Sequence, residues 1–168
     1  MITFVLGGAR SGKSTVAERL TTGLASPVTY IATLDLGDDT DLAARVERHR
    51  ARRPPGWRTV EAGLELPAVL RAVAGTVLVD SLGPWVSGAP GMEVDPESLC
   101  SALAERDGDT VVVSEEVGMS VHPSTEEGRL FRDALGALNQ AVAARADDTF
   151  LVVAGCTLRL GRPGVPRA

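Results

Sequence analysis

The stretch "ITFVLGGARSGKS", residues 2–14, predicts the first structural elements of the chain. Its first half is a continuous apolar run, as expected of a strand buried on both faces of a parallel sheet. Its second half, "GGARSGKS" at 7–14, fits the phosphate-binding pattern G-x-x-x-x-G-K-[ST]. Gly7 and Gly12 allow a sharp turn whose backbone N–H groups point at a phosphate, and a following helix adds its positive dipole end. The stretch therefore predicts a strand, a P-loop and a helix.

The composition supports this motif, because Lys13 is the only lysine beside 16 arginines. A compact ammonium fits inside a P-loop, whereas a planar guanidinium does not. In such loops the lysine reaches the β and γ phosphates, and the next hydroxyl, here that of Ser14, is a Mg²⁺ ligand. A glycine-rich turn without a ligand is the alternative. The lack of a second lysine excludes the guanine-reading N-K-x-D motif of switch GTPases.

The rest of the chain alternates short apolar runs with longer helical segments. Further strands are expected at 28–32, 76–80, 110–114 and 149–153, with a short one in "WRTVEA" (57–62). Helices are expected near 13–24, 38–52, 64–74, 95–106 and 126–146. The Pro/Gly stretch at 83–96 is interpreted as a surface loop, and 161–168 as a frayed tail. This order predicts the α/β class: a single P-loop NTPase domain over 1–168, with a mostly parallel sheet and helices on both faces.

Charge and cysteine content limit the partners. The net charge is −5, which argues against a nucleic-acid binder. Cys100 and Cys156 match no metal-binding spacing and are interpreted as reduced core thiols of a cytoplasmic protein. The apolar run at the start is too short to span a membrane. These features predict a protein that binds no nucleic acid and spans no membrane.

Two groups of acids follow predicted strands. Asp80 ends the run "TVLVD", where a P-loop protein usually carries the acid that completes its Mg²⁺ site. Glu115 and Glu116 follow "TVVVS", at the carboxyl end of a strand, where ligands of α/β sheets bind. One of the two could position a nucleophile or water, and solvated loop acids are the alternative.

Positive charge is concentrated in "RVERHRARRPPGWR", residues 45–58, which holds six arginines and His49. On a helix over 38–52, His49 would share a face with Arg45, and a packed histidine on a solvated helix is one interpretation. Arginines in this number could also bind a triphosphate from the side that the P-loop leaves open. A neutral imidazole among them could attack phosphorus. The residues alone leave both interpretations open.

Several segments together resemble one enzyme family. They are, in chain order, "GGARSGKS", "YIAT" (30–33), "AARVERHRARRPPGWRTVE" (43–61), "TVLVDSLGPWVSG" (76–88), "EVGMSVHP" (116–123), "FRDALGALNQAVA" (131–143) and "LVVAG" (151–155). The P-loop is generic, but the R-x-x-x-H-…-R-P-…-W-x-T-x-E and FRD…G…NQ blocks are specific. Over almost its whole length the chain resembles the adenosylcobinamide kinase/adenosylcobinamide-phosphate guanylyltransferase family.

The resemblance implies an enzyme of cobalamin biosynthesis with two activities. It would phosphorylate the aminopropanol hydroxyl of adenosylcobinamide with ATP or GTP, and then transfer GMP from GTP to give adenosylcobinamide-GDP. Transfer would pass through a guanylylated histidine, which falls on His49, with Lys13 as a further catalytic residue. The resemblance also implies a RecA-like fold and a homotrimer.

The resemblance carries a nucleotide-binding set with it, and Ser14 and Asp80 of this set would hold Mg²⁺. The set consists of Gly7, Gly8, Ala9, Arg10, Ser11, Gly12, Lys13, Ser14, Thr33, Leu34, Asp35, Arg50, Ala51, Arg52, Arg53, Glu61 and Asp80.

The chain departs from the family pattern at five positions. Where the family commonly has N-E-V-G-x-G-I-V-P, this chain reads "EEVGMSVHP", so that Glu115 replaces an amide, Ser120 a glycine and His122 a valine. Ser81 stands where cysteine is frequent, and Gly88 where asparagine is usual. These departures cluster where the corrinoid is expected, and they bear on corrinoid preference and on the balance of the two activities.

Two other functions are open to a chain with this P-loop. Another small-molecule P-loop kinase would use the arginines as a phosphate-closing lid and His49 as a structural residue, and it would form no covalent nucleotide adduct. A non-enzymatic RecA-type nucleotide-binding module would hydrolyse nucleotide slowly and use no acceptor. Its expected basic face for nucleic acid is not evident in an acidic chain.

Overall fold

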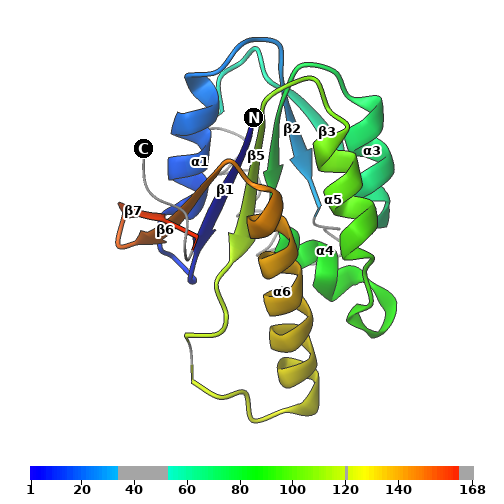
Figure 1. The fold of residues 1–168 in the computed structure, drawn as a ribbon, viewed down its shortest axis with the longest axis vertical. Helices are drawn as coiled ribbons and strands as arrows, with labels where there is room; N and C mark the ends of the chain where they lie inside the picture. Colours follow the sequence, from blue (N-terminus) through cyan, green and yellow to red (C-terminus); the bar gives the residue numbers. More distant parts are fainter. Residues whose placement is uncertain (34–52, 120, 163–168) are drawn as a thin grey trace.

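The computed structural model describes residues 1–33, 53–119 and 121–162 (Figure 1). Within them, seven strands form one sheet in the order β3-β2-β4-β5-β1-β6-β7, and only the β6–β7 pair is antiparallel. The strand bounds are Ile2–Gly7 (β1), Val28–Ala32 (β2), Arg58–Glu61 (β3), Thr76–Asp80 (β4), Thr110–Glu115 (β5), Asp148–Val153 (β6) and Cys156–Leu160 (β7). The expected mostly parallel sheet is confirmed.

The described helices cover both faces of this sheet. Their bounds are Lys13–Thr22 (α1), Leu66–Ala72 (α3), Leu82–Gly88 (α4), Pro96–Ala104 (α5) and Glu126–Arg145 (α6), with short 3₁₀ turns at Gly63–Glu65 (η1) and Pro90–Met92 (η2). Four of the five predicted helices and all the predicted strands lie within a few residues of these bounds. The helix predicted over 38–52 lies outside the described residues.

Alternation along the strands builds two separate layers of core. Phe4 and its counterparts on β2, β4 and β5 pack beneath α3, α4, α5 and α6. Val5 and the residues beside it on the neighbouring strands pack beneath α1, around Ala17. Because side chains alternate across a strand, a continuous apolar run is what a sheet covered on both faces requires. The α/β class with helices on both faces is therefore confirmed.

The loop predicted over 83–96 is wrong for its first part, which belongs to α4. Leu82, Trp85 and Val86 are all buried there, at helical spacing i, i+3 and i+4. Pro84 lies in the first turn of the helix, where no intrahelical N–H bond is required of it. Because the segment is rich in Gly and Pro, its apolar helical pattern was not recognised. The apolar side chains of this helix pack against α6.

Strand β7 was not predicted from the sequence, and one of the two cysteines lies on it. Ala154 and Gly155 form the β6–β7 turn, both with positive φ (51° and 79°), as in the tight turns that match the twist of a hairpin. Cys156 follows this turn and is exposed, so its assignment as a core thiol is wrong, whereas Cys100 is buried on α5 as expected. None of the described helices is long and apolar enough to cross a membrane.

Arg106 links the end of α3 to the start of β5 through hydrogen bonds. Its guanidinium donates to the carbonyls of Leu70 (2.6 Å), Val73 and Gly75 (2.6 Å), and its Nε donates to Thr110 Oγ1 (3.1 Å). Burial lowers the pKa of this guanidinium, because it removes water from around the charged form.

We expect Arg106→Ala to lower the free energy of unfolding by about 3 kcal/mol, because it leaves several half-buried carbonyls without a donor. Urea denaturation followed by circular dichroism measures this change. The control is Arg71→Ala nearby, which removes an exposed ion pair with Glu105 (2.7 Å) and should cost less than about 1 kcal/mol. Equal losses in the two variants would contradict the role given to Arg106.

Candidate functional site

The P-loop joins the carboxyl end of β1 to α1. Gly12 precedes the helix with a φ of 92°, a conformation that glycine adopts without steric cost. The N–H of Gly155, in the β6–β7 turn, donates to the carbonyl of Ser11 (2.8 Å). The turn of the unpredicted hairpin thus holds the phosphate loop from one side.

Gly7 has no room for a side chain. A Cβ built there would lie 2.4 Å from Ser11 Oγ and 2.8 Å from the backbone oxygen of Val152, whereas one built at Gly8 would meet nothing within 4 Å. Of these two adjacent glycines, only Gly7 is therefore closed to a side chain by its neighbours.

We expect Gly7→Ala to weaken nucleotide binding by at least roughly tenfold. The backbone oxygen of Val152 on β6 cannot yield to the new Cβ, so the loop that holds the phosphates would have to move instead. The control is Gly23→Ala at the end of α1, where a Cβ would come no closer than 3.4 Å to its neighbours, and it should bind within about threefold of wild type. Titration calorimetry with a nucleoside triphosphate measures both constants, and thermal unfolding checks the fold. Unchanged binding by a folded Gly7→Ala protein would show that the loop geometry is misassigned.

A hydroxyl and a carboxylate meet beside the P-loop. Ser14 Oγ donates to Asp80 Oδ1 (3.2 Å), and the phenol of Tyr30 donates to Asp80 Oδ2 (3.0 Å). Hydroxyl and carboxylate oxygens are the ligands that Mg²⁺ prefers, and such sites are completed by phosphate oxygens and water. Among the described residues, no group of three or more His, Cys, Asp or Glu side chains could hold a metal by itself. The Ser14–Asp80 pair therefore fits Mg²⁺ bound together with a nucleotide.

Tyr30, the only tyrosine of the chain, links this pair to Arg53. The Arg53 guanidinium lies 3.2 Å from the centroid of the Tyr30 ring, and Nη1 donates to Thr59 Oγ1 (3.2 Å). Burial, and after it the negative charge of Asp80, raises the pKa of Tyr30 well above its usual value. The phenol therefore stays protonated and keeps its proton directed at Asp80.

The single lysine faces a carboxylate from the next strand. Lys13 Nζ lies 3.4 Å from Glu115 Oε1, with side chains that are 13% and 26% exposed. The same oxygen accepts from Ser81 Oγ (2.8 Å), and Oε2 accepts from the N–H of Gly83 (2.9 Å). Of the two acids at the carboxyl end of β5, Glu115 is therefore the one at the phosphate loop.

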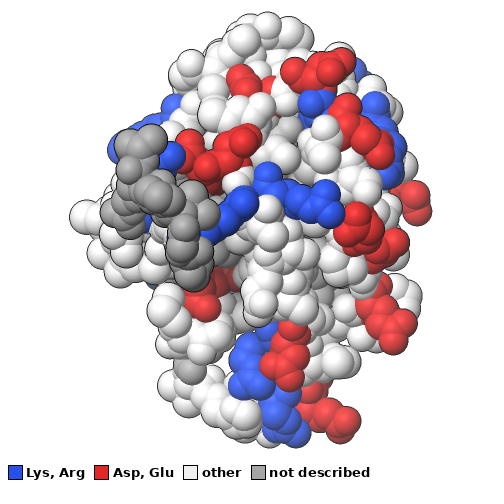
Figure 2. All heavy atoms as spheres, viewed as in Figure 1, with Lys and Arg blue, Asp and Glu red and all other residues white. Residues whose placement is uncertain are grey.

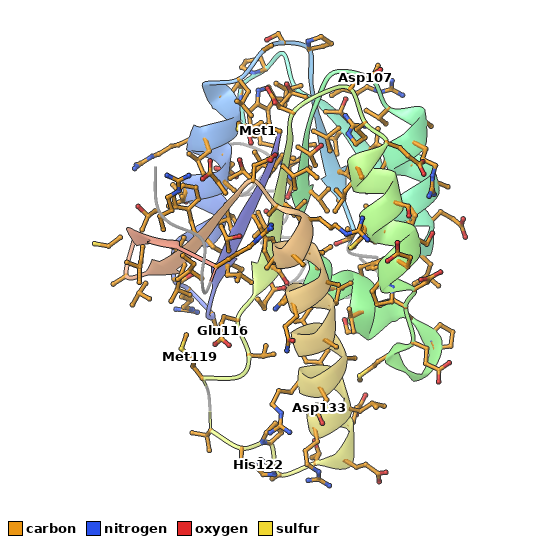
Figure 3. The ribbon with its side chains drawn as sticks, in the orientation of Figure 1. Met1, Asp107, Glu116, Met119, His122 and Asp133 are labelled. Carbon is orange, nitrogen blue, oxygen red and sulfur yellow. The ribbon has the colours of Figure 1, made fainter. Side chains whose placement is uncertain are left out.

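Glu116 has a local role instead. Its carboxylate accepts from the N–H groups of Gly118 (2.9 Å) and Met119 (3.1 Å), which closes the turn that leaves β5. Figure 3 shows this segment leading down to His122 at the tip, beside the first turns of α6. There Arg132 Nη1 lies 3.0 Å from His122 Nδ1. His122 is a loop histidine remote from the P-loop.

The other predicted nucleotide-binding residues divide into two groups. Thr33 follows β2, and its hydroxyl bonds to the carbonyl of Ser81, next to Asp80. Glu61 ends β3 at the same carboxyl end of the sheet, but three strands (β2, β4 and β5) separate β3 from β1. The remainder lie outside the described residues: Leu34, Asp35, His49, Arg50, Ala51 and Arg52.

Sequence reasoning missed three side chains that shape this site, namely Tyr30, Ser81 and Asn139. Asn139 on α6 accepts from Ser114 Oγ (2.6 Å) and donates to the backbone oxygen of Glu115 (2.9 Å). Two signals could have found them, because Tyr30 is unique in the chain and Asn139 belongs to the "FRDALGALNQ" block. For Ser81 the signal is its departure from the family pattern, which has cysteine frequently at this position.

Comparison with known proteins identifies the family. A model described as cobinamide kinase / cobinamide phosphate guanyltransferase matches residues 3–160. This chain belongs to that family. Among its curated relatives is the bifunctional adenosylcobalamin biosynthesis protein CobP of Pseudomonas aeruginosa, 40% identical over 169 residues, covering 95% of this chain and 97% of that protein. The corresponding CobU of Salmonella typhimurium is 37% identical over 182 residues, covering 95% and 99%.

The fold of this chain is shared with solved structures of other proteins. A prototypical ATPase of a type III secretion system aligns with a TM-score of 0.58 at 11% identity, covering 89% of this chain and 50% of that one. The flagellar accessory protein FlaH of Methanocaldococcus jannaschii aligns with 0.52 at 12% identity, covering 93% and 74%. These likenesses support the expected RecA-like P-loop fold and say nothing of the reaction.

Charges of both signs lie on the face shown in Figure 2, where the acidic and basic side chains of the described residues are interspersed. Family membership favours an enzyme over the non-enzymatic RecA-type module.

Proposed function

We propose that this chain carries both activities of its family. It phosphorylates the aminopropanol hydroxyl of adenosylcobinamide with ATP or GTP, and it then transfers GMP from GTP to the new phosphate, giving adenosylcobinamide-GDP. The observation that carries this proposal is the family match over residues 3–160, together with a P-loop whose lysine, hydroxyl and strand-end acid lie side by side.

The P-loop residues bind the triphosphate. The loop from Gly7 to Gly12 and the start of α1 direct backbone N–H groups at the phosphates, and Lys13 neutralises the β and γ oxygens. Ser14 and Asp80 would hold Mg²⁺, which would offset the negative charge that develops on the phosphates during transfer. Tyr30 fixes the second oxygen of Asp80, so that the carboxylate presents its first oxygen to Ser14.

Asp80→Asn tests the proposed metal pair. The amide keeps the shape and one acceptor, but it removes the negative charge that balances Mg²⁺. We expect lower kinase activity and a requirement for at least about tenfold more Mg²⁺, the factor that 1.4 kcal/mol represents. The measurement is the rate of cobinamide phosphorylation over a Mg²⁺ titration, with Asp133→Asn on the surface of α6 as the control. An unchanged Mg²⁺ dependence would reduce Asp80 to an ordinary strand-end acid.

His49 carries the guanylyl group in the second activity. Its ring nitrogen attacks the α-phosphorus of GTP, the bond from that phosphorus to the bridging oxygen breaks, and pyrophosphate leaves. An oxygen of cobinamide phosphate then attacks the same phosphorus, and the phosphorus–nitrogen bond breaks. Two displacements let pyrophosphate depart before the second anion approaches. Arg50, Arg52 and Arg53 contribute positive charge for the triphosphate.

A cytoplasmic homotrimer completes the proposal. The described surface offers an apolar edge for contact between copies, since β7 is an exposed strand at the end of the sheet. Val153, Leu158 and Leu160 expose 60%, 59% and 39% of their surface there. An uncovered apolar edge strand commonly marks a place where another chain binds.

The direct test of the function follows both products in one purified preparation. Adenosylcobinamide and ATP should give adenosylcobinamide phosphate, and the addition of GTP should then give adenosylcobinamide-GDP and pyrophosphate, each identified by mass spectrometry. Phosphorylation without guanylyl transfer would favour the simpler small-molecule kinase. Hydrolysis of nucleotide with no change in the corrinoid would contradict both.

A further inference from the structure

Glu115 is held at the phosphate loop by contacts on its backbone and on its side chain. Its backbone oxygen accepts from Asn139 Nδ2 (2.9 Å), and Asn139 is itself oriented by Ser114 (2.6 Å). In the sheet Glu115 lies opposite Gly7, the first residue of the phosphate loop. A carboxylate so fixed cannot turn away into solvent without breaking several contacts.

The carboxylate has capacity for one more proton contact. Ser81 Oγ and Lys13 Nζ occupy Oε1, and the N–H of Gly83 occupies Oε2. A carboxylate offers about four lone-pair sites, so one site on Oε2 is left over from these three contacts. The side chain is 26% exposed, which leaves it accessible to a substrate.

The position of Lys13 shows what lies next to this carboxylate. The P-loop lysine binds the β and γ phosphates, and Glu115 Oε1 is 3.4 Å from its ammonium. Glu115 therefore borders the phosphoryl group that is transferred. An acceptor hydroxyl that approaches this phosphorus comes within reach of a fixed negative oxygen.

We propose that Glu115 is the catalytic base of the kinase step, an inference that rests on the proposed function. The substrate hydroxyl oxygen forms a bond to the γ-phosphorus while the bond from that phosphorus to the β-bridging oxygen breaks. The hydroxyl proton passes to Oε2 of Glu115, and the nucleoside diphosphate leaves with the bonding electrons. The protonated carboxyl then releases its proton to solvent.

Glu115→Ala and Glu115→Gln test the proposal, with Glu116→Ala as the matched control. General-base catalysis contributes on the order of 100-fold, so cobinamide phosphorylation should lose about that factor in kcat in both Glu115 variants. Guanylyl transfer to preformed cobinamide phosphate deprotonates no hydroxyl and should stay within about threefold of wild type. Glu116→Ala should keep both rates, because its carboxylate closes only its own turn.

Formate separates a base from a mere partner of Lys13. In Glu115→Ala, added formate should restore phosphorylation by roughly tenfold, since a small carboxylate can occupy the space and take the proton, whereas chloride at equal ionic strength should not. A changed KM for nucleotide with unchanged kcat, or equal loss of both activities without rescue by formate, would overturn the proposal. A wild-type enzyme that phosphorylates no cobinamide would instead overturn the proposed function itself.

Gly83→Ala provides a second route if the Glu115 variants fail to fold. A Cβ at Gly83 would lie 2.2 Å from Glu115 Oε2, so the carboxylate must shift while its chemistry stays the same. Phosphorylation should then fall at least roughly tenfold, with guanylyl transfer retained. A full rate of phosphorylation in this variant would contradict the assignment of Oε2.

Discussion

Lys13→Arg is expected to lower phosphoryl transfer by at least the roughly tenfold that 1.4 kcal/mol represents, although it keeps the charge. The lysine side chain is only 13% exposed, and its ammonium lies 3.4 Å from Glu115. A guanidinium is larger and planar, so it would have to displace either the carboxylate or the backbone of the loop. Because Lys13 is proposed to bind the triphosphate in both half-reactions, both rates should fall.

The measurement is the steady-state rate of each half-reaction, with thermal unfolding to confirm the fold. Arg19→Lys, an exchange of the same two cations in the last turn of α1, is the control and should leave both rates unchanged. A folded Lys13→Arg protein with wild-type turnover would show that the P-loop lysine has been misassigned.

His49→Ala is expected to separate the two activities. Guanylyl transfer should be abolished, because no neighbouring side chain replaces the imidazole as the nucleophile. Phosphorylation of adenosylcobinamide should survive better, since direct transfer of the γ-phosphate needs the P-loop and metal but no covalent carrier. Both rates are to be measured in the same preparation, because the expected result is a change in their ratio.

Arg52→Ala is the matched control for that variant. It should weaken triphosphate binding without removing the nucleophile, and raised GTP concentrations should therefore restore guanylyl transfer. The His49→Ala protein should not respond to GTP in this way. Equal loss of both activities in His49→Ala would indicate a structural histidine.

The sequence was sufficient to predict the central strands of the sheet, because these strands are apolar on both faces. Runs such as 76–80 and 110–114 could be placed without knowledge of their neighbours, and the structure confirms them within a residue. Helix α4 and strand β7 were missed for a common reason. Pro84 and Gly155 lie within or beside regular structure, where the surrounding packing decides their conformation.

The site could be predicted where a motif fixes it and not where the fold assembles it. The P-loop and Asp80 follow from spacing alone, and the structure brings them together. Tyr30 and Glu115 reach the same place from β2 and β5, and only the order of strands in the sheet reveals this. Contacts between residues so far apart along the chain leave no periodic signal in it.

The covalent guanylyl carrier is tested most directly by labelled GTP. The wild-type protein is incubated with GTP labelled at the α-phosphorus or, in parallel, at the γ-phosphorus, and the modified peptide is mapped. We predict label from the α position on His49 that is lost in acid, survives alkali and transfers to adenosylcobinamide phosphate when that acceptor is added. Label from the γ position should be absent from this residue. Guanylyl transfer at the full rate, with no α-label on the protein at any time, would contradict the account.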